Sequence, residues 1–164
     1  MAEEHIAIEG KENSAPQFAI DRIFVKDISL ETPRGLDAFA GQWKPRVDLD
    51  INTTQNPIGD NRYEVTLRLT ITVKSQETDD VYYLVEIKQS GVFLAKGFAE
   101  KDLPRLLASA APTALFPYAR ETIDSLVIKA GFPPLRLAPI NFDALLQAAV
   151  KQQQQQSQGP ETVQ

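Results

Sequence analysis

Strict alternation of apolar and polar residues runs through the middle of the chain and predicts its clearest strand. Val65, Leu67, Leu69, Ile71 and Val73 alternate with polar or charged residues over ten positions. Successive side chains of a strand point to opposite faces of a sheet, so this segment should bury one face and leave the other in water. That arrangement is typical of an antiparallel sheet.

Three other segments have the pattern of strands: 18–31, 47–51 and 81–95. The apolar residues of the first segment change face around Lys26 and Asp27, which requires a bulge or a twist there. Polar turns separate the last three strands, so we expect consecutive strands to pair antiparallel. The residues expected on the two faces of the segment 81–95 are Val81, Tyr83, Val85 and Ile87 on the core side, and Tyr82, Leu84, Glu86 and Lys88 on the other.

A helical pattern follows the strands. Apolar residues recur at spacings of three and four over 103–130, with Asp102 as the expected N-cap and Gly131 as the residue after the helix. Pro117 removes a backbone hydrogen bond, so the helix should be kinked or should restart there. Asn141 can cap a shorter final helix.

These elements predict an α+β fold, with a four-stranded antiparallel sheet followed by a long kinked helix and a short C-terminal helix. We expect a single domain over residues 16–151. Residues 1–15 are acidic and poor in apolar pairs, which predicts a disordered leader. Residues 152–164 are rich in glutamine, which predicts a disordered tail.

Charge and composition exclude several classes of function. The formal net charge is -5 and the sequence pattern predicts no clustered basic face, which argues against a nucleic-acid partner. The chain has no cysteine, so disulfides, thiolate metal sites and a cysteine nucleophile are excluded. It lacks the pattern of a signal peptide and any apolar stretch of about 18 residues. We expect a cytoplasmic protein without direct membrane insertion.

No constellation of catalytic residues or metal ligands is found. His5 is the only histidine, and no other candidate ligand accompanies it in the acidic leader. The chain contains no phosphate-binding glycine loop, nucleophile elbow or calcium loop. We therefore expect no enzyme, no cofactor and no metal. The connector 131–141 is instead rich in proline and apolar residues and carries little charge, which favours binding over chemistry.

Several large apolar residues fall outside the predicted core faces. Tyr82 and Leu84 lie opposite the core side of their strand, and Phe116 and Tyr118 lie off the apolar stripe of the long helix. Large exposed apolar patches are uncommon on monomers. We therefore expect a homo-oligomer.

Aromatic and aliphatic residues also gather in segments that should be loops. Phe39 and Trp43 lie in the connector between the first two strands, and Phe132 and Leu135 follow the long helix. They could simply be core residues, because Trp and Phe are usually largely buried. The functional alternative is a groove in which these residues accept apolar side chains of an extended polypeptide.

Five short segments, taken in their order along the chain, are the residues that carry a family resemblance. They are VKDISLETP at 25–33, WKP at 43–45, LFPYARE at 115–121, GFPP at 131–134 and LAPINFDAL at 137–145. In this order they resemble the SecB family of bacterial protein-export chaperones. The likeness runs from about residue 18 to residue 150, and it leaves out the leader and the tail.

The resemblance implies a homotetramer, a dimer of dimers that holds unfolded preproteins without ATP and delivers them to the SecA motor ATPase. In the family, SecA binds an acidic face of the sheet. The matching positions in this chain are Asp27, Glu31, Leu84 and Glu86. The family also uses its C-terminal helix and tail as a second contact with SecA-type partners. The tail departs from that pattern here, because Glu161 is the only acidic residue after Asp143.

Two classes of function stay open. One is the ATP-independent holdase for unfolded secretory preproteins. The other is a non-catalytic scaffold or ligand-binding module for one specific folded partner. A holdase should suppress the aggregation of several unrelated unfolded proteins and ignore their folded forms. The resemblance also leaves room for a specialised family member, for example one that serves a toxin–antitoxin system.

Overall fold

The computed structural model describes residues 15–157 of the 164. The predicted leader up to residue 14, with His5, and the end of the predicted tail lie outside the described residues.

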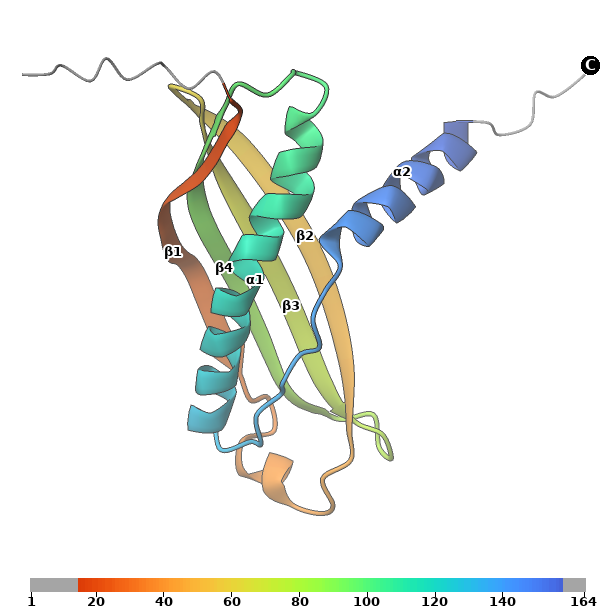
Figure 1. Ribbon diagram of the computed structural model, residues 1–164. Helices are drawn as coiled ribbons and strands as arrows, with labels where there is room; N and C mark the ends of the chain where they lie inside the picture. Colours follow the sequence, from red (N-terminus) through yellow and green to blue (C-terminus); the bar gives the residue numbers. More distant parts are fainter. Residues whose placement is uncertain (1–14, 158–164) are drawn as a thin grey trace, which may run out of the picture.

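Four long strands form one antiparallel sheet (Figure 1). The strands are β1 (Gln17–Glu31), β2 (Pro45–Gly59), β3 (Arg62–Ser75) and β4 (Val81–Lys96). Their order in the sheet is β1-β4-β3-β2, so β1 and β2 are the two edge strands. The predicted α+β fold with a four-stranded antiparallel sheet is confirmed.

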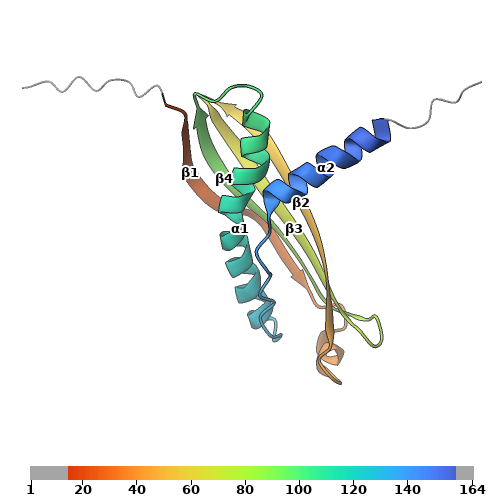
Figure 2. The ribbon, with the colours of Figure 1, turned by 45° about the vertical axis from the view of Figure 1, so that its right-hand side comes forward.

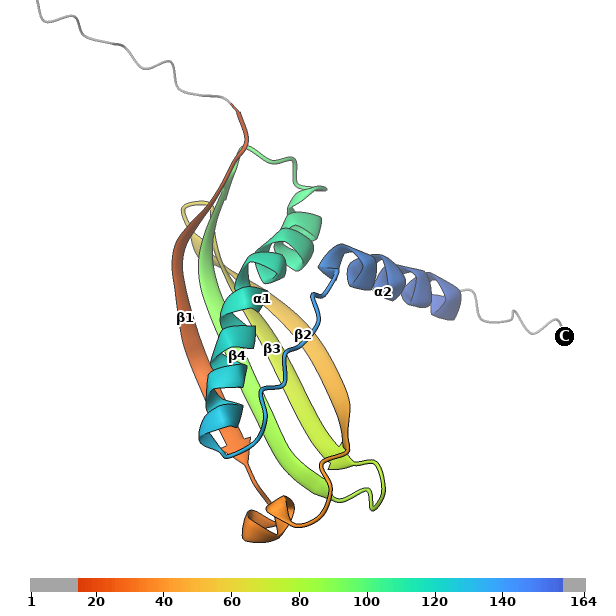
Figure 3. The same ribbon diagram turned by 60° about the horizontal axis from the view of Figure 1, so that its bottom comes forward.

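A long helix, α1 (Leu103–Lys129), covers one face of this sheet (Figures 1 and 3). We call the covered face the inner face and the opposite one the outer face. Leu115, Ala119 and Ile123 of α1 are fully buried with the alternating apolar residues of β3 and β4. Burial of this apolar surface is the main stabilising term of the fold.

The helix α1 continues through both of its internal prolines, Pro112 and Pro117, so it does not restart at Pro117. It begins directly after Asp102, as predicted, but the Asp102 side chain makes no capping hydrogen bond. Only the backbone carbonyl of Asp102 takes part, accepting from the Leu106 N–H at 3.1 Å.

Register shifts occur in β1, where one was expected, and also in β2 after Pro57 and near the start of β4. In β1 the register shifts between Val25 and Asp27, which confirms the bulge, and a second shift follows Ile20. In β4 the predicted faces are wrong near the start, because Val73 pairs with Tyr83 while Lys74 pairs with Val81. The extra residue, Tyr82, is therefore only 4% exposed and does not lie on the wet face.

The second helix, α2 (Phe142–Ser157), projects away from the sheet (Figures 1 and 2). Asn141 caps it as predicted, since its Oδ1 accepts from the Ala144 N–H at 2.9 Å. Phe142 packs edge-on against Phe116 with ring centroids 6.0 Å apart. This contact buries Phe116, which the sequence pattern placed off the apolar stripe.

The final helix is longer than predicted. It continues through the glutamines to Ser157, so residues 152–157 of the predicted disordered tail are helical. Glutamine is a good helix former, and the helix meets no proline or glycine before its end. Within residues 15–157, neither helix is long and apolar enough to cross a membrane.

Candidate functional site

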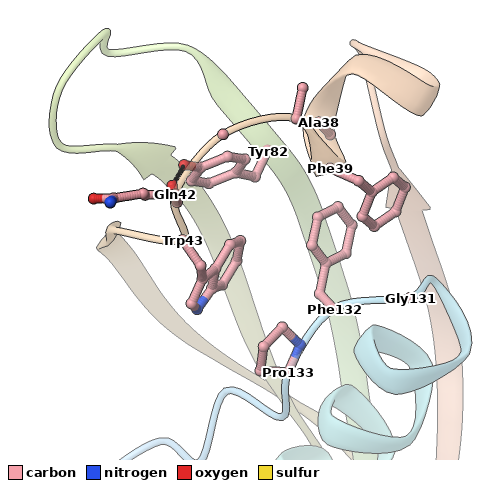
Figure 4. A pocket seen from close by; sticks show the side chains of 10 residues that line it. Ala38, Phe39, Gln42, Trp43, Tyr82, Gly131, Phe132 and Pro133 are labelled. Atoms are coloured by element: carbon pink, nitrogen blue, oxygen red, sulfur yellow. Dashed lines mark hydrogen bonds between the residues drawn. The ribbon is translucent and has the colours of Figure 1, made fainter.

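An aromatic recess lies at the end of the sheet where α1 terminates (Figure 4). It has a volume of about 200 Å³. Three separate segments line it: the connector from β1 to β2, the start of β4 and the residues after α1. The lining residues are Ala38, Phe39, Ala40, Gly41, Gln42, Trp43, Tyr82, Gly131, Phe132 and Pro133.

Phe132 is the centre of the aromatic packing. Its ring centroid lies 4.8 Å from Phe39, 5.7 Å from Trp43 and 4.8 Å from Tyr83. Trp43 also packs on Tyr82 at 4.7 Å. Phe132 is 4% exposed, whereas Phe39 is 51% and Trp43 39% exposed. The recess therefore has a buried aromatic floor and a partly exposed aromatic rim.

The C-terminal turn of α1 places Phe132 on that floor. The Gly131 N–H donates to the Ile128 carbonyl at 3.0 Å, and the Phe132 N–H donates to the Val127 carbonyl at 3.2 Å. These two bonds form a Schellman motif, in which the residue after the glycine packs back onto the protein. Gly131 has φ +95°, and a Cβ there would meet the Phe39 ring at 3.1 Å. Only glycine fits both the conformation and the space.

Asp124 holds the chain that leaves this turn. Its Oδ1 accepts hydrogen bonds from the backbone N–H groups of Leu135, at 3.1 Å, and of Arg136, at 3.0 Å. Arg136 has φ +50°, a conformation that non-glycine residues adopt at a cost. One carboxylate on α1 therefore fixes the connector on the far side of Phe132.

Tyr83 lies beneath Phe132 and is fully buried. Burial raises the pKa of the Tyr83 hydroxyl to about 12, and the negative charge of Asp124 adds to the effect. Among residues 15–157 the hydroxyl has no hydrogen-bond partner. The neutral phenol therefore belongs to the packed floor of the recess.

The structure brings three of the four predicted client-binding residues together. Phe39, Trp43 and Phe132 line the recess, whereas Leu135 packs against the core beside it. Tyr82 is a lining residue that the sequence pattern placed elsewhere. Its hydroxyl donates to the Gln42 carbonyl at 3.3 Å, which joins β4 to the connector. The only hint of this role in the sequence is the adjacent pair Tyr82 and Tyr83. A bulge determines the direction in which the Tyr82 side chain points, and the sequence pattern did not predict that bulge.

The four residues predicted to bind SecA share the outer face of the sheet. Glu31 is in register with Leu84, and Asp27 with Lys88, on the adjacent strands β1 and β4. Directly opposed residues of an antiparallel pair point to the same face. Glu86 belongs to the same alternation as Leu84, and it accepts a hydrogen bond from Thr70 Oγ1 at 3.0 Å.

Two further acids extend this group. Asp48 and Asp50 of β2 are opposite Thr72 and Thr70 of β3, which are in turn opposite Leu84 and Glu86. The sequence pattern identified Asp48 and Asp50 as a wet strand face but could not place them in these rows, because β2 and β4 are joined only through β3.

The recess and the outer face are surfaces that could bind another molecule. In the part of the chain that the structure covers, no group of three or more His, Cys, Asp or Glu residues could hold a metal ion. The recess contains aromatic rings, a proline and small residues, and its walls present no charged side chain. Such a concave apolar site suits an apolar or aromatic group of a ligand.

Comparisons with known proteins agree on one family. A family model described as preprotein translocase subunit SecB matches residues 11–155. A protein-export protein SecB of Marinobacter nauticus is 49% identical over 97% of this chain and 95% of its own length. The same protein of Methylococcus capsulatus is 47% identical over 90% of this chain and 96% of its own length.

A solved structure shares the fold. It is a SecB-like chaperone of Mycobacterium tuberculosis in complex with a peptide from an antitoxin. The TM-score is 0.62 at 18% sequence identity, and the match covers 75% of this chain and 90% of that one.

Removing the Asp124 carboxylate should loosen the recess. In Asp124→Ala two backbone N–H groups lose their acceptor, so we expect the free energy of unfolding to fall by about 1 kcal/mol. The fluorescence of Trp43, the only tryptophan, should shift to the red as Phe132 moves away from it. Asp124→Asn is the matched control, because its amide oxygen can accept the same bonds. Identical emission from Asp124→Ala and the wild type would contradict this role.

The Tyr83 hydroxyl should ionise at a higher pH than an ordinary tyrosine. Its pKa is raised from 10.0 to about 12, so an alkaline titration of tyrosinate absorbance should contain one component that forms only near pH 12. The unfolded chain releases that proton first, so the free energy of unfolding should fall as the pH rises from 10 to 12. Tyr83→Phe should remove the late component. Ionisation of Tyr83 near pH 10, its ordinary value, would show that the hydroxyl is accessible.

Proposed function

This chain belongs to the SecB family of protein-export chaperones, and we propose that it holds unfolded preproteins at its aromatic recess and delivers them to SecA. The recess is the observation that supports the proposed binding of unfolded preproteins. Its partly exposed rim of Phe39 and Trp43 stands over a buried floor, so an apolar side chain of a client can enter without rearrangement of the core.

The strand that follows Trp43 also exposes apolar residues. Trp43 leads directly into β2, where Val47 and Leu49 of the inner face are 41% and 37% exposed. Strand β2 is an edge strand, so its outer backbone groups have no partner strand within the described chain. An extended client could pair with that edge through main-chain hydrogen bonds, which do not depend on the side chains of the client. This combination suits a binder of many unfolded chains.

Exposed apolar residues on α1 support assembly into a homotetramer, a dimer of dimers. Tyr118 and Ile128 are 53% and 54% exposed, and both lie on the helix that covers the inner face. Packing of helices from paired protomers would cover them. Residues 16–151 would form the chaperone domain, and the end of α2, as far as Ser157, would extend beyond it. We place the assembly in the cytoplasm, where preproteins are met before export.

The acids of the outer face are the surface that we assign to SecA. Asp27, Glu31 and Glu86 project from it beside Leu84, which offers a small apolar contact among charges. A basic segment of SecA would complement this surface. Binding and release at such surfaces need no chemistry, so we expect neither ATP hydrolysis nor any other catalytic activity, and no cofactor.

Trp43→Ala should weaken the binding of unfolded clients more than it lowers stability. Removing a rim aromatic should raise the dissociation constant about tenfold, as for a central interface residue. Anisotropy of labelled unfolded preproteins and suppression of their aggregation would measure the effect. Leu36→Ala is the control, because Leu36 lies in the same connector, is exposed and does not line the recess. Unchanged affinity with a lowered melting temperature would refute the assignment.

The same assay decides between the two classes of function. Several unrelated clients should bind when diluted from denaturant and should not bind when folded, and light scattering should give a mass of about four chains. Binding of one folded partner alone would favour the scaffold instead.

Glu86→Lys should weaken SecA binding about tenfold or more, because a basic partner would meet a like charge. The mass measured by light scattering should not change, since the outer face lies away from α1. Glu100→Lys reverses the charge of an exposed acid outside the sheet and serves as the matched control. Normal SecA affinity in Glu86→Lys would contradict the proposal that SecA binds this surface.

A further inference from the structure

The outer face also carries a basic region beside its acids. Lys88 of β4 is in register with Arg68 of β3, and Arg68 with Asn52 of β2. These residues line a hollow of about 290 Å³ together with Lys26, Thr54 and Thr66. We call it the cationic hollow. No acidic side chain lines it.

Lys26 reaches this hollow from β1, at the position of the bulge. The register passes from Val25 opposite Gln89 directly to Asp27 opposite Lys88, which leaves Lys26 as the extra residue. Its Nζ forms a salt bridge with Glu64 of β3, although β4 lies between these strands. The Lys26 side chain must therefore cross β4 on the outer face. Val25 is opposite Gln89 of the inner face, so the alternation along β1 turns Lys26 outward, and the extra residue lets Asp27 face outward as well.

The cations of the hollow are only partly neutralised. Lys26 pairs with Glu64, and the Arg68 guanidinium is 4.0 Å from Asp50, at the limit of an ion pair. Lys88 makes no ion pair among residues 15–157, although Asp27 is its cross-strand neighbour. The buried Nε of Arg68 also has no hydrogen-bond acceptor within that range. An unpaired donor on a charged group is costly, so a ligand oxygen would be favourable there.

We propose that the cationic hollow binds the side-chain carboxylate of an acidic polypeptide segment. Two of its three cations have acids of their own, so one positive charge is left, which suits a carboxylate better than a doubly charged phosphate. Asn52, Thr54 and Thr66 add amide and hydroxyl groups that can hydrogen-bond a peptide backbone beside the bound side chain. The site lies outside the recess, so it does not depend on the proposed client binding.

The test uses the full chain and a labelled, end-capped hexaglutamate peptide, with binding followed by fluorescence anisotropy. Lys88→Gln should weaken binding about three- to fivefold, the range of one partly exposed ion pair. Arg68→Gln should do the same, with circular dichroism confirming the fold. Lys74→Gln is the control, because Lys74 lies on the same face of β3 but outside the hollow. A hexaglutamine peptide should not bind.

Three outcomes would overturn the proposal. If Lys74→Gln weakens binding as much as Lys88→Gln, the attraction is a diffuse field and the hollow is no site. If hexaglutamine binds equally well, the carboxylate is not recognised. If inorganic phosphate binds with the same dependence on Lys88 while the peptide does not, the hollow takes a free anion and the polypeptide ligand is wrong.

Discussion

The packing of α1 on β3 and β4 is the constraint on which the other features depend. It buries one face of two central strands, with Leu115, Ala119 and Ile123 among the fully buried residues. A single helix cannot cover four long strands. The inner face of β2 is therefore left partly exposed, and the outer face stays free to carry polar and charged residues. The surfaces proposed for client and partner binding are the parts of the sheet that α1 does not cover.

The way in which α1 ends determines the aromatic recess. A Schellman turn at Gly131 directs Phe132 back against Phe39, Trp43 and Tyr83. Asp124 then fixes the following residues through two backbone hydrogen bonds. The recess is thus assembled from three segments distant in sequence, and a helix terminus gives it a rigid floor. A rigid floor reduces the conformational entropy lost when a client side chain binds.

Charged residues of the outer face lie in rows across the strands. Glu31, Glu86, Asp48 and Asp50 occupy two neighbouring rows, and the next row holds Lys88 and Arg68 with Asp27 at its β1 end. Lys26 extends from β1 to the same basic region. A partner that covers both regions must present a complementary order of charges, which selects orientation as well as identity.

Features that depend on a local pattern of residues could be predicted from the amino-acid sequence. The alternation of Val65 to Val73, the cap at Asn141 and the glycine after α1 each act within a few residues, so they could be read from the chain and predicted the fold. The apolar character of the two connectors also indicated Phe39, Trp43 and Phe132. The burial of Tyr82, the contact of Phe116 with Phe142 and the convergence of Lys26, Arg68 and Lys88 were visible only in the folded structure. A bulge causes the first, the packing of α2 on α1 the second and cross-strand register the third, and each joins segments that no local pattern relates.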